Sequence, residues 1–164
     1  MTFVVPFDGS ALAEAALVRA VEYASALNED VVAVSVVPER TRYAREKGWI
    51  AEDESYDVEA VIETLREQVK TLTPDVAFEY KRIREFPPEA EIADHVEQLA
   101  LDHDPSVVFL GSDNVGSVVT PLTSVGVHIA GEEAYDVFVV RQPEPPGIDA
   151  IDPHSEFYER DESS

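Results

Sequence analysis

Apolar and polar positions along the chain alternate between two patterns, which predict strands and helices in turn. Short, nearly continuous apolar runs are typical of strands that are covered on both faces, whereas apolar residues at helical spacing indicate amphipathic helices. The runs predict strands at residues 3–7, 31–37, 107–110 and 137–140, and an alternating segment predicts a further strand at 76–83. The helical spacing predicts helices at residues 11–27, 58–72, 87–103 and 124–130. This order favours an α/β fold, a doubly wound open sheet of five parallel strands with right-handed crossovers and helices on both faces.

Capping and breaking residues set the boundaries of these elements. Ser10 and Asp57 are good N-cap residues for the first two helices, and Thr73-Pro74 stops the second helix. The inward face of the first helix is expected to hold Leu12, Ala16, Ala20, Tyr23, Ala24 and Leu27. The strand at 76–83 alternates and is more polar than the others, which suits the edge of a sheet.

The chain suits one α/β domain at residues 1–141, followed by a tail at residues 142–164. The tail is acidic, rich in proline and without periodicity, so we expect it to be loosely ordered. The chain has 164 residues, enough for a substantial core. We expect a cytoplasmic protein, since neither a run of eighteen apolar residues nor a charged-then-apolar leader is present. The absence of cysteine excludes disulfides, thiolate metal sites and thiol catalysis.

The net charge of −22 is extreme, because 34 acidic residues face only 12 basic ones. Molar salt shortens the Debye length to roughly 3 Å, so the repulsion among these charges would be screened there. The balance therefore indicates a halophilic protein, adapted to high salt. It also disfavours binding to nucleic acid or to an anionic membrane, which needs a broad basic face.

Two strand-to-helix elbows are the candidate ligand site. Asp8-Gly9-Ser10 follows the first strand, and Gly111-Ser112-Asp113-Asn114 follows the fourth, with Thr123-Ser124-Val125 opening the next helix. In an open α/β sheet, ligands bind outside the carboxyl ends of the strands, beside helix N-termini. Alternatively, Asp8 could simply cap the first helix, and the 111–125 loop could be a purely structural elbow or hold another kind of ligand.

The segment at 40–49 carries four of the twelve basic residues, together with Tyr43 and Trp49. It follows the second strand at its carboxyl end, so it should overhang the same crevice. Two interpretations stay open. The segment could grip an anion with its basic and aromatic side chains, or it could be a solvated insertion balanced by Glu52, Asp53 and Glu54.

Catalytic and metal-binding signatures are weak. The four histidines show no metal spacing, although His95 and His103 are expected on one helix. The serines at the elbows have no base beside them in the sequence, and no Gly-x-Ser-x-Gly elbow occurs. We therefore expect no catalytic residues and no metal site formed by the protein alone.

Six segments together resemble the universal stress protein family across residues 2–141. They are VVPFDGS at 4–10, VSVVP at 34–38, FPPEAEI at 86–92, VFLGS at 108–112, TSV at 123–125 and VFVVR at 137–141. The resemblance implies a Rossmann-like sheet in the order 3-2-1-4-5 and a homodimer through residues 137–140. In one branch of the family it also implies ATP or AMP, with Mg²⁺, bound between the ends of the first and fourth strands.

This resemblance also implies the candidate cofactor-binding residues. They are Pro6, Asp8, Val36, Gly111, Asn114, Thr123, Ser124 and Val125. The phosphate loop departs from the family pattern, since Asn114 and Thr123 replace two glycines, the loop is one residue shorter, and Asp113 adds a negative charge. Glycines in such a loop let backbone N–H groups approach phosphate, so we interpret this loop as degraded.

The expected function is a non-enzymatic regulatory or stress-response protein of the universal stress type. Two alternatives stay open. The first is a nucleotide-dependent switch that binds ATP or AMP and hydrolyses ATP slowly. The second is an anion or metabolite sensor that uses the basic segment at 40–49.

Overall fold

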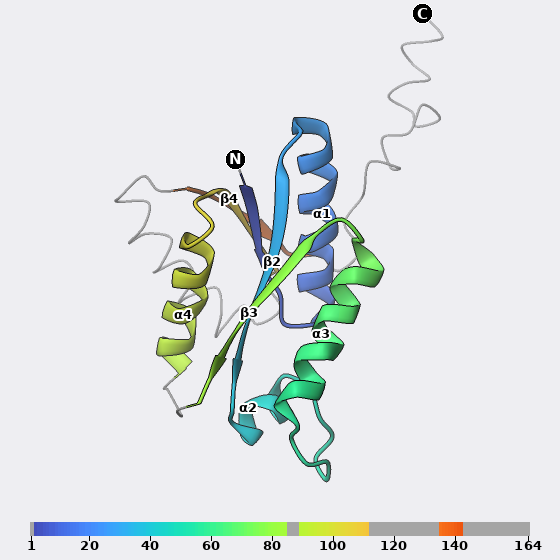
Figure 1. Ribbon diagram of the computed structural model, residues 1–164, viewed down its shortest axis with the longest axis vertical. Coiled ribbons are helices and arrows are strands. Elements are labelled where there is room, and N and C mark those ends of the chain that lie inside the picture. The colour runs from blue at the N-terminus through green and yellow to red at the C-terminus, as the bar shows by residue number, and fades with distance from the viewer. Residues whose placement is uncertain (1, 85–88, 112–134, 143–164) are drawn as a thin grey trace, which may run out of the picture.

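Five parallel strands form the centre of the molecule in the computed structural model, which describes residues 2–84, 89–111 and 135–142 (Figure 1). The strands lie in the order β3-β2-β1-β4-β5, which confirms the predicted fold class and the strand order that the resemblance implied. Their bounds are β1 Thr2–Pro6, β2 Asp30–Pro38, β3 Ala77–Ile83, β4 Pro105–Gly111 and β5 Asp136–Val140. The helix expected at 124–130, the residues Asn114, Thr123, Ser124 and Val125, and the tail lie outside the described residues.

Three longer helices cover the two faces of this sheet. Their bounds are α1 Ala11–Leu27, α3 Val58–Leu72 and α4 Glu89–Leu101. α1 and α3 lie on one face and α4 on the other (Figure 1). A fourth, short helix that the sequence did not predict, α2 Thr41–Glu46, follows β2. No helix in the described ranges is both long and apolar enough to span a membrane.

Alternate residues of the central strands pack into two cores, one under each layer of helices. Val5 and Phe109 pack beneath α1 and α3, whereas Val4 and Val108 pack beneath α4. Val4 and Val5 are both fully buried, which explains why these strands read as continuous apolar runs. Each such side chain contributes about 1.5–3 kcal/mol of burial free energy, so the central strands are rigid supports for whatever follows them.

The predicted helix caps are present. The Ser10 hydroxyl accepts a hydrogen bond from the Ala13 N–H at 3.2 Å, and the Asp57 carboxylate accepts one from the Ala60 N–H at 3.3 Å. The inward placement of Leu27 was wrong, because 64% of it is exposed. Leu27 is the last residue of α1, where the chain turns through left-handed Asn28 toward β2.

Candidate ligand site at the ends of β1 and β4

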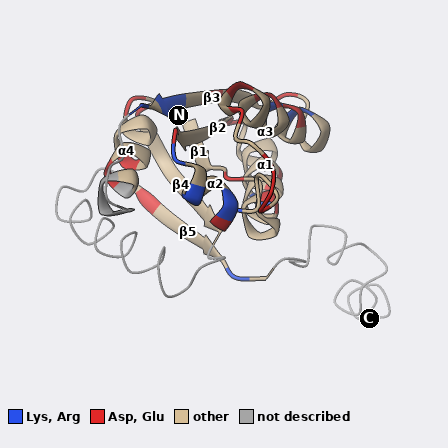
Figure 2. Cartoon of the chain, turned by 90° about the horizontal axis from the view of Figure 1, so that it is seen from below, with Lys and Arg blue, Asp and Glu red and all other residues tan. Residues whose placement is uncertain are grey.

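The strand order reverses direction between β1 and β4, so the carboxyl ends of these two strands form the topological switch point of the sheet. Pro6 ends β1 and Gly111 ends β4, and α1 begins between them at Ala11. Figure 2 looks onto this edge and shows α2 in front of the strand ends, beside α1. The fold therefore brings together Pro6, Asp8 and Gly111, three of the candidate site residues.

Val36 is further from this point than the other described candidates. It lies on β2, two residues beyond Val34, which is the register partner of Pro6. Its side chain is buried in the core beneath α4, together with Ile83. Val36 therefore packs within the fold.

Asp8 is held by two side-chain interactions. Its Oδ1 accepts a hydrogen bond from the Ser10 N–H at 3.0 Å, and its Oδ2 lies 2.8 Å from the Lys47 ammonium nitrogen. The alternative that Asp8 caps α1 was wrong. The Ser10 side chain is the cap, and Asp8 instead accepts a hydrogen bond from the Ser10 N–H. Burial raises the pKa of Asp8, but Lys47 and the hydrogen bonds from Lys47 and Ser10 outweigh burial and leave the pKa below its ordinary value.

The segment at 40–49 packs directly onto this elbow. The Trp49 indole N–H donates a hydrogen bond to the Asp8 carbonyl oxygen at 2.7 Å. Ala44 is fully buried and Ile50 is 8% exposed, so the segment also has an apolar underside. The segment is therefore solvated only in part: Arg42 and Arg45 are exposed, whereas the apolar contacts and the Asp8 pair hold the segment against the fold. Sequence reasoning did not assign Lys47 and Trp49 to Asp8.

Buried Ser35, on the neighbouring strand β2, fixes the end of β1. Its hydroxyl donates a hydrogen bond to the Phe7 carbonyl oxygen, and the Phe7 N–H donates to the Val34 carbonyl oxygen at 2.8 Å. The chain therefore leaves β1 in one fixed direction, and this direction sets where Asp8 points.

Gly111 lies against the first turn of α1. A Cβ on Gly111 would be 2.4 Å from the Leu12 carbonyl carbon and 2.7 Å from the Ala13 nitrogen, distances that real Cβ atoms essentially never show. Glycine is therefore required here for the close packing of β4 on α1. The packing role exists whether or not the following loop binds a phosphate.

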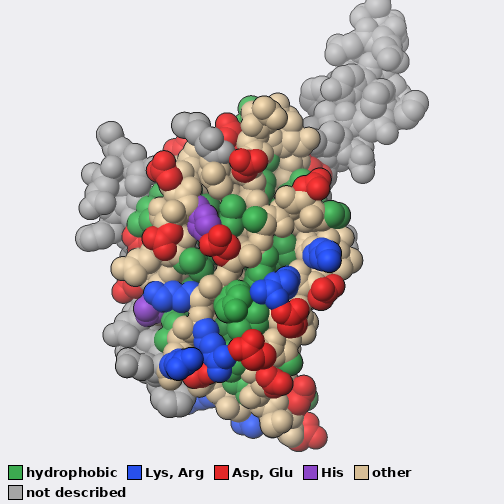
Figure 3. Space-filling model, viewed as in Figure 1, with side chains coloured by type: hydrophobic (Ala, Val, Ile, Leu, Met, Phe, Trp, Pro, Cys, Tyr) green, Lys and Arg blue, Asp and Glu red, His purple; other side chains and the backbone are tan. Residues whose placement is uncertain are grey.

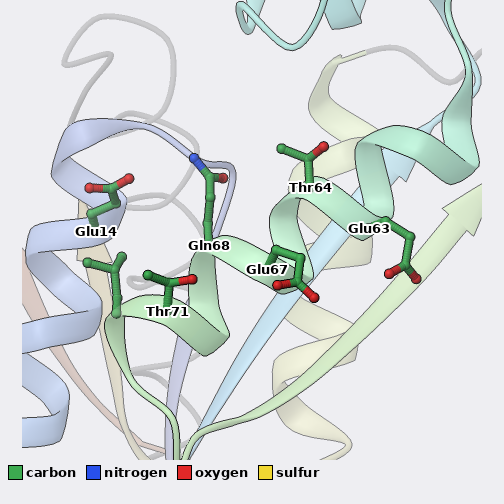
Figure 4. Close-up of a pocket in the computed structure, with 7 residues that line it drawn as sticks. Glu14, Glu63, Thr64, Glu67, Gln68 and Thr71 are labelled. Carbon is green, nitrogen blue, oxygen red and sulfur yellow. The ribbon is translucent and has the colours of Figure 1, made fainter.

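An open groove of about 520 Å³ runs between α1 and α3 beside this elbow (Figure 4). Its rim carries the carboxylates of Glu14, Glu63 and Glu67, and Gln68 points toward the chain between β1 and α1. Glu63 is paired with Arg66, but the Glu14 and Glu67 carboxylates repel a phosphate, so the groove is a poor place for the anionic part of a nucleotide.

Basic side chains in the described part of the chain also lie among carboxylates. Figure 3 shows Lys and Arg interleaved with Asp and Glu on one face. Arg82 pairs with Glu39 and Glu59, and Arg66 lies over the rings of Phe78 and Tyr80, at 5.8 and 5.7 Å from their centroids. These two arginines are therefore matched by carboxylates or aromatic rings.

The histidines within the described ranges are separate from the elbow. α4 ends at Leu101, so the expectation that His95 and His103 share a helix was wrong. His103 Nε2 lies 2.9 Å from Glu79 Oε2, but not at a hydrogen-bonding angle. Across the described ranges, no group of three or more His, Asp or Glu residues is arranged to hold a metal ion.

Comparison with known proteins gives a family and a fold. The sequence profile of the universal stress protein family matches residues 1–141. The solved structure of a universal stress protein in complex with cAMP has a TM-score of 0.53 and 18% identity, over 86% of this chain and 97% of that one. Universal stress protein UspA from Lactobacillus plantarum has a TM-score of 0.50 and 18% identity over the same shares. At these identities the likeness shows the fold, and a search of curated proteins gave no match.

Proposed function

Because the chain belongs to the universal stress protein family, we propose that it is a non-enzymatic regulatory or stress-response protein with a ligand crevice at the ends of β1 and β4. The crevice lies at the topological switch point, where open α/β sheets bind ligands. Its described walls are the chain from Asp8 to Ser10, the glycine end of β4 and the segment at 40–49.

The observation that carries this proposal is the set of hydrogen bonds and ion pairs that the polar side chains of the elbow make. The Ser10 hydroxyl caps α1, and the Ser35 hydroxyl holds the end of β1. Asp8 is paired with Lys47 and has a lowered pKa, so it is ionised at neutral pH. An ionised and paired carboxylate can recognise a donor group, but it is a weak general base, because a base works best when its pKa lies near the working pH. The described side chains of the elbow are therefore suited to binding rather than to proton transfer.

Adenine nucleotide is the ligand that we propose for this crevice. The Asp8 carboxylate can accept hydrogen bonds from amino and hydroxyl groups of a nucleoside, and a related fold is known in complex with cAMP. Binding should be weak, because Asn114 and Thr123 replace two glycines of the family's phosphate loop, and because the nearby groove is acidic. We expect wild-type protein to bind ATP with a Kd above about 100 μM, equivalent to roughly −5.5 kcal/mol.

The alternative is a switch that binds ATP firmly and hydrolyses it slowly, with Mg²⁺ supplying charge neutralisation at the phosphates. The same cAMP complex favours nucleotide binding here as well. The anion-sensor alternative is weaker, since the Lys47 charge is matched by Asp8. Phosphate release from Mg²⁺-ATP, measured at saturating protein, separates the switch from a protein that only binds.

Calorimetry in molar KCl tests the proposal. The triple variant Asp113→Asn, Asn114→Gly, Thr123→Gly should bind ATP roughly tenfold more tightly, because one regained charge-assisted hydrogen bond contributes about 1.5–3 kcal/mol. Asp75→Asn is the matched control, since Asp75 is exposed just before β3, at the opposite edge of the sheet. Micromolar binding by the wild type would show that Asn114 and Thr123 are compatible with the phosphate loop. No binding by either protein would remove adenine nucleotide from the proposal.

A further inference from the structure

We propose that residues 41–50 form a strap that is latched to Asp8 and must release before a ligand reaches the Asp8 carboxylate. This inference rests on the proposed function, because it concerns the regulation of the same crevice. The strap consists of α2 and the turn that follows it, and it lies in front of the ends of β1 and β4 (Figure 2).

Two polar contacts latch the strap to a single residue. Lys47 lies 2.8 Å from the Asp8 Oδ2, and the Trp49 indole N–H donates to the Asp8 carbonyl oxygen at 2.7 Å. The Lys47 side chain is 18% exposed and the Asp8 side chain 29% exposed, so the pair is shielded more than an ordinary surface ion pair. Both contacts therefore hold the strap at Asp8, where the proposed ligand crevice begins.

Apolar contacts add to the latch, since Ala44 and Ile50 belong to the core and Trp49 packs against it. Ala44 and Ile50 are the buried residues of the strap, and the Tyr43 and Trp49 rings meet edge to face at 5.5 Å. α2 has six residues, and Arg40 gives it no side-chain cap. Because short helices are stabilised mainly by packing, this element depends on its contacts with the elbow to stay in place.

The strap has a fixed stem, formed where Tyr56 meets Pro38, and an open turn at Gly48. The Tyr56 hydroxyl donates to the Pro38 carbonyl oxygen at 2.9 Å, which ties together the two ends of the connection between β2 and α3. Gly48 lies between the two latching residues with φ +75°, and an added Cβ there would have no atom within 4 Å. The strap can therefore lift as a loop while its stem stays joined to the fold.

The hydrogen bonds of the Asp8 carboxylate indicate which group of a ligand competes with the strap. Asp8 Oδ1 accepts from the Ser10 N–H, and Oδ2 is the oxygen that the strap occupies. The Lys47 ammonium is a donor at that oxygen. A ligand that donates an N–H or O–H to the same oxygen, such as the amino or hydroxyl group of a nucleoside, competes with Lys47 for it.

Trp49 reports the strap directly, because it is the only tryptophan in the chain. We expect Lys47→Met to shift its fluorescence to longer wavelength and to increase its quenching by acrylamide at least twofold. Lys47→Arg keeps the charge and should behave as the wild type. Lys70→Met is the matched control, since Lys70 is exposed near the far end of α3.

Adenosine is the binding probe, because it has donor groups but no phosphate to interact with the Lys47 charge. Release of the strap should tighten adenosine binding by up to about tenfold, the gain when the open fraction rises from about a tenth to near one. Trp49→Phe keeps an aromatic ring and removes the indole N–H, so it gives a second, independent release. It should also tighten adenosine binding.

Four outcomes are distinct. Trp49 exposure together with tighter adenosine binding in Lys47→Met supports the strap. Unchanged Trp49 fluorescence in Lys47→Met overturns the latch, whatever the ligand result. Exposed Trp49 with weaker adenosine binding also overturns the strap as a competitor, because Lys47 would then be part of the binding site. Exposed Trp49 with no adenosine binding by any variant supports the latch and counts against the proposed nucleotide function instead.

Discussion

Replacing Gly111 with alanine tests whether this glycine is required for packing. The added Cβ would lie 2.4, 2.5 and 2.7 Å from three backbone atoms of Leu12 and Ala13. Ordinary contacts begin near 3.4 Å, so β4 and the first turn of α1 must separate by about 1 Å. Overpacking costs about 1–3 kcal/mol, and backbone atoms yield less than side-chain ends, so we expect a loss near 3 kcal/mol.

Urea denaturation in molar KCl measures this loss. With an m-value of about 2 kcal/mol/M, the midpoint should fall by roughly 1.5 M. Gly48→Ala is the matched control, since Gly48 has φ +75° but open space around an added Cβ. It should cost only the left-handed strain of about 1–2 kcal/mol. The packing argument fails if Gly111→Ala is no more costly than Gly48→Ala. A Gly111→Ala protein that keeps its midpoint and loses ATP binding would show instead that the glycine serves the ligand.

Three further predictions concern salt, association and alkaline pH. The melting temperature should rise clearly from low to molar KCl, because screening relieves repulsion among the charges behind the net −22; a flat or falling curve would remove the halophile interpretation. Val137 and Val139 are each 41% exposed on the edge strand β5, so Val139→Lys should convert a homodimer to monomer by light scattering, and a monomeric wild type in molar salt would refute the dimer. Burial, with Tyr43 and Glu39 nearby, raises the pKa of Tyr56 to about 12 from an ordinary 10.0. The folded state then holds a proton that the unfolded state loses, so stability should fall between pH 10 and 12, and Tyr56→Phe should reduce this fall in urea midpoints.

The sheet could be predicted from the sequence because burial on both faces leaves a local pattern. Val4 and Val5 are adjacent in the chain and buried on opposite faces, which gives the continuous apolar run that marks a central strand. β3 is exposed at most of its positions, and its alternation indicated an edge. Patterns of this kind involve residues only a few positions apart, so they can be recognised in the sequence.

The strap could not be predicted in this way. Within α2 only Ala44 is buried, so the helix leaves no periodic signal. The pair between Lys47 and Asp8 joins residues 39 positions apart, and nothing local in the sequence encodes it. A lone lysine in an arginine-rich segment, two residues before the sole tryptophan, was the available hint.

The candidate site was predicted only in part. A glycine at the end of β4 was expected, but whether its missing side chain faces a helix or a ligand depends on the distance between β4 and α1. Asp8 follows the end of β1, but its partner Lys47 was not foreseen, and its role toward a ligand stays a prediction. The roles of Asn114, Thr123, Ser124 and Val125 stay predictions, since these residues lie outside the described ranges.

Native mass spectrometry of the protein, purified in high salt and exchanged rapidly into a volatile salt, tests the central claim most directly. A crevice with a degraded phosphate loop and a latched Asp8 should hold no adenine nucleotide through purification, because a Kd above about 100 μM corresponds to rapid dissociation. We therefore predict the mass of the unliganded chain. Stoichiometric ATP or AMP bound to the wild-type protein would contradict the account and favour the nucleotide switch.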